Sequence, residues 1–194
     1  MESGKFEDMR RSMVDSQLRT SGVTESWVLA AMGSIAREDY VPGSHQTTAY
    51  MDRSLELESG EMLNPPVSTA LLLQAADVQA DDNVLLIGQS DGYVAAVLKT
   101  RTAHLTTAAA DNLGAARGGA PYACIIVDGA AEELPDALFT LAADDARLVT
   151  GIVEGAVTRL ATGFIQNGKV ALKPIADSEI GHLAAFARKP EFVF

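Results

Sequence analysis

Apolar positions recur at helical spacing within the first 37 residues of the chain. Three of them lie three or four residues apart, namely Val28, Ala31 and Ile35. Thr24 stands just ahead of them as the predicted N-cap, and Val41-Pro42-Gly43 ends the pattern. We therefore predict that this stretch is helical up to about Arg37.

A second helical segment follows an irregular, polar stretch over residues 43–65. Pro66 suits the start of a helix, and an apolar run from 67 to 78 continues it. Residues 1–80 are thus predicted to form a mainly helical part of the protein.

The pattern then changes to one that is typical of a parallel sheet. Val84 to Ile87 form a continuous apolar run, which indicates a strand buried on both faces. A tight turn, Gly88-Gln89-Ser90-Asp91-Gly92, separates it from an apolar, helix-compatible stretch over 93–98. A strand, a glycine turn and a helix in this order indicate the first unit of a doubly wound sheet.

Further apolar runs extend the sheet. Strands are predicted at 105–108, 122–127, 147–153, 157–165 and 169–172, and a helix around Glu132 to Leu141. Strands 84–87 and 122–127 should be parallel neighbours, whereas Asn167-Gly168 is a hairpin signal that predicts antiparallel strands at one edge. The prediction is one α/β domain over residues 1–194, with its sheet in residues 81–194.

The net charge of the chain limits the classes of partner that it can bind. The formal net charge is −11 and the pI is about 4.6, which disfavours binding to the phosphate backbone of nucleic acid. No apolar run reaches the ~18 residues of a membrane span, and the polar, acidic first residues do not resemble a secretory signal. We therefore expect a cytoplasmic protein that binds neither nucleic acid nor membrane.

Cysteine and histidine indicate no disulfide or metal chemistry. The single cysteine, Cys124, falls in a predicted buried strand and is interpreted as a core residue rather than a nucleophile. His45, His104 and His182 show no metal-ligand spacing. No metal site is predicted.

The glycine turn is a candidate ligand site. Gly88 and Gly92 stand where backbone could approach a ligand at a helix N-terminus. Taken alone, the turn is as compatible with ligand binding as with a simple tight turn.

Several longer segments resemble one enzyme family in their order and spacing. They are Met13-Val14-Asp15-Ser16-Gln17-Leu18-Arg19, Val28-Leu29-Ala30-Ala31-Met32, Arg37-Glu38-Asp39-Tyr40-Val41-Pro42, Gly92-Tyr93-Val94-Ala95-Ala96-Val97-Leu98, residues 120–131 with Pro135, and the ending 186–194. Together they are similar to protein-L-isoaspartate O-methyltransferases over nearly the whole chain. The resemblance implies a Rossmann-like fold, S-adenosylmethionine as cofactor, and methyl transfer to the α-carboxylate of isoaspartyl residues in damaged protein. That carboxylate is already a nucleophile, so alignment and exclusion of water would suffice without a strong base.

The first cofactor motif departs from the family pattern, which is roughly acid-x-Gly-x-Gly-x-Gly. The matching positions are Leu86, Gly88, Ser90 and Gly92, so leucine replaces the acid and serine replaces the middle glycine. The β-carbon of Ser90 would hinder close backbone approach to a cofactor. Asp91 is nearby but not at the acid's position. Gly88, Ser90, Asp91 and Gly92 remain the candidate cofactor-binding residues.

A strand–helix unit is missing as well. Residues 100–122 leave room for about one strand and a loop, whereas a βαβ unit takes roughly 30 residues. The fold should therefore be shortened by about one strand–helix unit, which would carry the acid that holds the cofactor ribose. Asp111 is either a remnant of the adenine-side motif or part of an Asp-Asn turn.

The substrate side differs too. The family's Gly-x-Thr-Ile-Ser-x-Pro corresponds to Gly60-Glu61-Met62-Leu63-Asn64-Pro65-Pro66, which puts Asn64 at the serine position. Asn64 can donate and accept hydrogen bonds, and it is the candidate catalytic residue. Alternatively, it is a helix cap or turn residue ahead of the prolines.

Two main functions follow from these departures. One is a degenerate family member with weak or lost binding of S-adenosylmethionine and an interaction role toward a protein or peptide partner. The other is an active carboxyl methyltransferase that acts on isoaspartyl residues. Another small-molecule ligand in the same crevice is a third option. A shortened sheet could leave apolar surface exposed, which would allow a homodimer.

Overall fold

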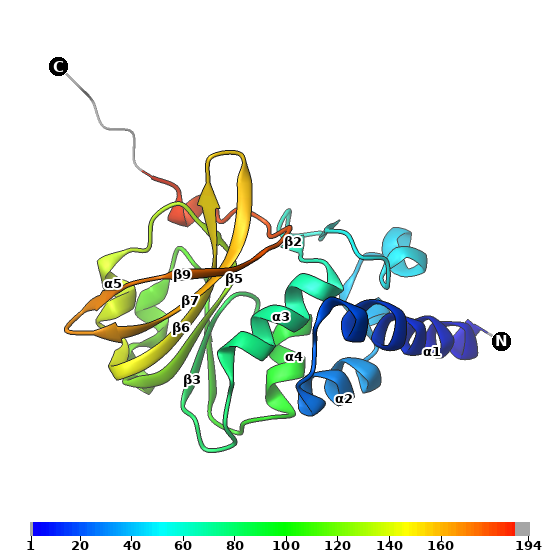
Figure 1. Ribbon diagram of the computed structural model, residues 1–194, viewed down its shortest axis with the longest axis horizontal. Coiled ribbons are helices and arrows are strands. Elements are labelled where there is room, and N and C mark those ends of the chain that lie inside the picture. Colours follow the sequence, from blue (N-terminus) through cyan, green and yellow to red (C-terminus); the bar gives the residue numbers. More distant parts are fainter. Residues whose placement is uncertain (1, 189–194) are drawn as a thin grey trace.

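A mixed seven-stranded sheet forms the centre of the computed structural model, which describes residues 2–188 (Figure 1). The strand order is β4-β3-β5-β6-β7-β8, and β9 also pairs with β7. Pairs among β3, β4, β5 and β6 are parallel, and the later pairs are antiparallel. The strands are β3 (Val84–Ile87), β4 (Leu105–Ala108), β5 (Tyr122–Ala131), β6 (Ala142–Glu154), β7 (Val157–Gln166), β8 (Lys169–Val170) and β9 (Lys173–Asp177). This confirms the predicted α/β, Rossmann-like fold with antiparallel C-terminal strands.

The apolar run of β3 divides its side chains between two cores. Val84 and Leu86 pack into the cluster on the helical side, and Leu85 and Ile87 pack into the cluster on the opposite face. All four side chains are fully buried. Burial of each contributes roughly 1.5–3 kcal/mol, which explains why this central strand is apolar at every position.

Four helices cover one side of the sheet. Figure 1 shows α3 (Pro66–Ala76) and α4 (Tyr93–Lys99) against the sheet, with α1 (Glu2–Met13) and α2 (Ser26–Ser34) beyond them. Pro66 begins α3 as predicted. Short π-helical and 3₁₀ turns continue the chain after α1 to Ser21.

The predicted N-cap at Thr24 is wrong. Glu25 occupies the position before α2, and no side chain caps this helix end. The backbone N–H of Thr24 instead donates to Oε1 of Gln74 at 2.7 Å. Thr24 thus ties the loop before α2 to α3, a contact with a residue 50 positions away.

The predicted helix over 132–141 is also largely wrong. β5 continues to Ala131, and only Asp136–Phe139 is helical, as α5. The backbone N–H groups of Glu132 and Glu133 both donate to the carbonyl of Phe186 at 3.0 Å. These residues therefore pair with the C-terminal segment and do not form the first turn of a helix.

Two short connections set the shape of the sheet ends. Asn167 and Gly168 have φ values of 53° and 70°, so the predicted hairpin turn lies in the left-handed region that Asn and Gly tolerate. Between β4 and β5, the chain forms a 3₁₀ helix over Leu113–Gly119, where a strand–helix unit was expected to be missing. β4 is consequently the edge strand next to β3.

The single cysteine lies in the core, as the sequence predicted. Cys124 is buried, and burial raises the pKa of its thiol to about 12, which agrees with a core residue.

The ending 186–194, which carries part of the family resemblance, lies outside the described residues from position 189 onward. Among residues 2–188, no helix has both the length and the apolar composition that spanning a bilayer requires.

Candidate functional site

A crevice opens at the carboxyl ends of β3, β4 and β5. It has two adjoining parts with volumes of about 810 and 760 Å³. Residues that line both parts are Tyr40, Leu57, Ser59, Glu61, Gly88, Gln89, Gly92 and Ala109. This is the edge at which open α/β sheets bind their ligands.

The glycine turn between β3 and α4 forms the floor of the crevice. Gly88 donates its N–H to the carbonyl of Ala108 at 3.0 Å, which holds the turn against β4. A β-carbon at Gly92 would lie 2.9 Å from Cβ of Gln89, so this position requires glycine for space. Ser90 is exposed and its φ is not positive. The fold therefore accepts serine there without strain, and the effect of its β-carbon falls on a ligand.

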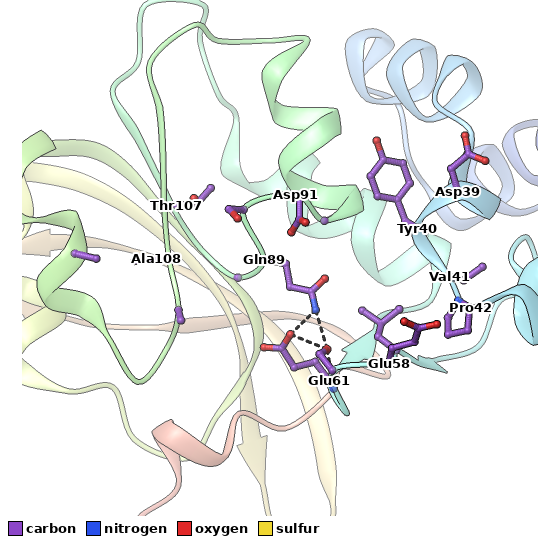
Figure 2. A pocket seen from close by; sticks show the side chains of 17 residues that line it. Asp39, Tyr40, Val41, Pro42, Glu58, Glu61, Gln89, Asp91, Thr107 and Ala108 are labelled. Carbon is purple, nitrogen blue, oxygen red and sulfur yellow. Dashed lines mark hydrogen bonds between the residues drawn. The ribbon is translucent and has the colours of Figure 1, made fainter.

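Gln89 reaches from this turn across the crevice (Figure 2). Its Nε2 donates to Oγ of Ser59 at 3.0 Å and to the carboxylate of Glu61. Both acceptors lie on the loop that joins β1 (Leu55–Glu56) to β2 (Met62–Leu63), a hairpin that the sequence did not predict. The turn and this hairpin thus meet over the crevice.

The turn and the end of β4 differ from the family's cofactor pattern at two acidic positions. Leu86 is fully buried in the helical-side core, at the position of the family's acid. β4 ends at Ala108 and is followed by Ala109 and Ala110, whereas a carboxylate near this strand end commonly holds a ribose hydroxyl. Asp111 lies in a turn that the N–H of Asn112 closes on Ala109 at 3.0 Å, and it also lines the crevice.

Asn64 joins three segments directly behind the crevice wall. Its Nδ2 donates to Oδ1 of Asp128 at 2.8 Å, and its Oδ1 accepts the N–H of Gly181 at 2.7 Å. The residue is 3% exposed. Pro65 occupies the N-cap position of α3, so the interpretation of Asn64 as a helix cap is wrong.

Arg37 holds the backbone of Asn64 in place through a buried hydrogen bond. Its guanidinium is fully buried, donates from Nη2 to the carbonyl of Asn64 at 2.5 Å, and donates from Nε to the carbonyl of Ala49 at 2.8 Å. It also lies 5.0 Å from the ring centroid of Tyr93. Burial lowers the pKa of Arg37, an effect that the neighbouring Tyr93 and Asp128 oppose. The backbone of Asn64 is thereby fixed independently of any ligand.

The crevice is electrostatically negative. Its lining includes six acidic residues: Asp39, Glu58, Glu61, Asp91, Asp111 and Asp128. The described lining contains no Lys or Arg, and His182 is its one basic side chain. Burial raises the pKa of Asp128 to about 6, although the hydrogen bond from Asn64 and the charge of Arg37 act in the opposite direction.

The structure brings together the predicted site residues and adds others. Gly88, Ser90, Gly92, Asp111 and Asn64 border one crevice or lie directly behind its wall. Asp128, Gln89 and Glu61 were not among the predicted site residues. The position of Asp128 after an apolar strand next to β3 was a usable signal, because parallel strands end at the same edge.

No candidate metal site is found among the residues that the structure describes. The described residues contain no group of three or more His, Cys, Asp or Glu side chains arranged to hold a metal ion.

All the comparisons with known proteins that follow point to the same family. The model of the family described as Protein-L-isoaspartate(D-aspartate) O-methyltransferase matches residues 9–110. A protein-L-isoaspartate O-methyltransferase of Koribacter versatilis is 31% identical over 165 residues, which cover 72% of this chain and 74% of the relative. One from Methanoculleus marisnigri is 29% identical over 202 residues, which cover 90% and 91%.

Solved structures show the same fold. One protein-L-isoaspartate O-methyltransferase superposes with a TM-score of 0.75 at 17% identity, covering 92% of this chain and 67% of its own. A Plasmodium falciparum protein described as a protein-L-isoaspartate O-methyltransferase superposes with a TM-score of 0.74 at 16% identity, covering 91% and 98%. That structure contains S-adenosyl-L-homocysteine.

Proposed function

Because the chain belongs to the protein-L-isoaspartate O-methyltransferase family, we propose that it is a degenerate member which binds S-adenosylmethionine weakly or not at all. In this proposal it is a cytoplasmic protein that acts by binding a protein or peptide partner. The observation that carries the proposal is Leu86, a fully buried leucine where the family pattern has an acid.

The expected loss of affinity is large. A charge-assisted hydrogen bond contributes roughly 1.5–3 kcal/mol net. The acid at position 86 and a carboxylate at the end of β4 are both replaced by apolar residues, and Ser90 hinders backbone approach. Together these changes would remove ~4 kcal/mol or more, which is roughly a thousandfold in affinity.

An active carboxyl methyltransferase is the second candidate. The observation that favours it is the crevice itself, because Gly88 and Gly92 line it and Asn64 stands behind its wall at the family's serine position. S-adenosylmethionine would supply the methyl group if it bound there. Gly88 and Gly92 would allow backbone approach, and the N–H groups at the start of α4 would face the ligand.

The two candidates differ in two measurable quantities. Calorimetric titration with S-adenosylmethionine should show no saturation at micromolar concentration, and a synthetic isoaspartyl peptide should gain no methyl group from labelled cofactor. A relative that is active under the same conditions serves as the positive control. Micromolar binding together with methyl transfer to the peptide would reject the proposal in favour of the active enzyme.

A further inference from the structure

We infer that the crevice receives an alkylammonium group, such as a lysine side chain of a peptide, against Asp128, and that it rejects a carboxylate there. The inference rests on the proposed function, because it specifies the chemistry of the partner that the same crevice would bind. Its starting point is the contact between Asn64 and Asp128.

Asn64 already holds a carboxylate that belongs to the protein. By the family resemblance, the side chain at this position would face the carboxylate of the acceptor. Here its amide donates to Asp128 and its carbonyl accepts from Gly181. A ligand carboxylate at Asn64 would therefore meet a second carboxylate of like charge at close range.

No cation of the lining offsets this repulsion. Arg37 is fully buried and is not part of the lining, and it donates from Nε and Nη2 to two backbone carbonyls. Its charge opposes the raised pKa of Asp128 without cancelling it. Glu61 and Asp111, by contrast, line the same 760 Å³ part as Asp128. His182 lines it as well, on an exposed stretch of the C-terminal segment. The field at Asp128 thus favours a cation.

The second carboxylate oxygen of Asp128 can accept a hydrogen bond from a ligand. Within residues 2–188, Asn64 is the one side chain that donates to Asp128, and its Nδ2 binds Oδ1 of that carboxylate. Asp128 lines the cavity, so its second oxygen is left to accept from a ligand. An ammonium group carries three donors and no acceptor, which matches this oxygen better than an alcohol or a carboxylate does.

The apolar part of the lining suits the stem of such a group. Leu57, Met62, Leu63, Ile87 and Leu183 line the same part of the crevice as Asp128. A lysine side chain buries its methylene stem on apolar surface and keeps its charge at a polar end. One ligand therefore satisfies both the apolar wall and the acid.

Three small probes test the inference on the wild-type protein without cofactor. n-Butylammonium, n-butanol and butyrate share one stem and differ in charge, and each is titrated while the side-chain amide signal of Asn64 is followed by NMR. The expected order of affinity is butylammonium, then butanol, then butyrate, with at least a tenfold difference between the first and the last. Butyrate binding at Asn64 as tightly as butylammonium, or more tightly, would overturn the inference.

Two variants localise the effect. Asp128→Asn should weaken butylammonium at least tenfold, whereas Glu58→Gln, which removes an equal charge from the adjoining 810 Å³ part, should weaken it less than threefold. Equal weakening in both would also overturn the inference, because it would show only the general field of an acidic crevice. The order of the three probes stands as the test if Asp128→Asn does not fold. The titrations contain no S-adenosylmethionine, so the proposed function is tested separately: methylation of an isoaspartyl peptide in an assay with added cofactor would reject it.

Discussion

The side-chain amide of Asn64 and the carboxylate of Asp128, 64 residues apart in the chain, are joined by a hydrogen bond of 2.8 Å. The contact links the loop before α3 to β5, and the N–H of Gly181 adds the C-terminal segment to the same side chain. One buried amide thus connects three parts of the fold at the wall of the crevice.

Asn64→Leu should lower the free energy of unfolding by about 2–4 kcal/mol, because it leaves the carboxylate of Asp128 and the N–H of Gly181 without their partner. Asn64→Ser should cost less, since its hydroxyl can satisfy one of the two groups. Urea denaturation followed by circular dichroism measures both. The exposed Asn112→Leu is the control and should stay within about 0.5 kcal/mol of wild type. An unchanged stability of Asn64→Leu would show that Asn64 is only a turn residue.

The contribution of Asp128 to the stability of the protein should fall as pH rises from about 4 to about 6. The pKa of Asp128 is raised from 3.8 to about 6 in the folded state, so the folded chain holds a proton that the unfolded chain has released. Ionisation of this group then disfavours folding by about 2–3 kcal/mol once pH exceeds 6. Asp128→Asn should lack this component, so its stability should exceed that of wild type at pH 7 and approach it near pH 4. Parallel stability curves for the two proteins would contradict the assignment.

Gln89→Ala should release the β1–β2 hairpin from the glycine turn. It removes the donor to Ser59 and Glu61, both at the surface, so global stability should change by less than about 0.5 kcal/mol. Hydrogen exchange should nevertheless become faster in residues 57–61. Gln79→Ala, an exposed glutamine in the loop between α3 and β3, provides the comparison. If exchange in 57–61 were the same in both variants, the bridge would not hold the hairpin.

Ser90→Gly should raise the affinity for S-adenosylmethionine by up to about tenfold while leaving it weaker than micromolar, because the other two lost contacts remain absent. The added backbone freedom should cost about 0.5–1 kcal/mol of stability. Asp81→Gly, in an exposed turn outside the crevice, should show the same cost with no change in binding. Calorimetry of the two variants separates these effects, and equal affinities would show that the β-carbon of Ser90 does not limit approach.

The strands were largely predictable because their signals are local. The apolar run at 84–87 is β3 with the same bounds, and the Asn167-Gly168 turn lies where the sequence predicted it. β5 extends four residues past its predicted end at 127, because the small residues Ala130 and Ala131 pair with β6. A pattern of apolar residues cannot reveal that extension.

The crevice was harder to predict because its contacts join distant segments. Asn64 and the glycine turn could be located from the family resemblance, but the partner of Asn64 is in β5 and its second contact is at Gly181. The shortened helix after β5 has the same cause, since Glu132 and Glu133 pair with Phe186. No window of neighbouring residues contains either relationship.

The pairing of residues 181–186 with β5 also sets an order of events during synthesis. The carbonyl of Gly181 accepts the N–H of Ala130, and Leu183 donates to the carbonyl of Ala130. A nascent chain folds from its N-terminal side as it leaves the ribosome. Until residues 181–186 emerge from the exit tunnel, the N–H groups of Ala130, Glu132 and Glu133 and the side-chain Oδ1 of Asn64 have no partners from this segment. The crevice is therefore completed late in translation, well after the glycine turn has been made.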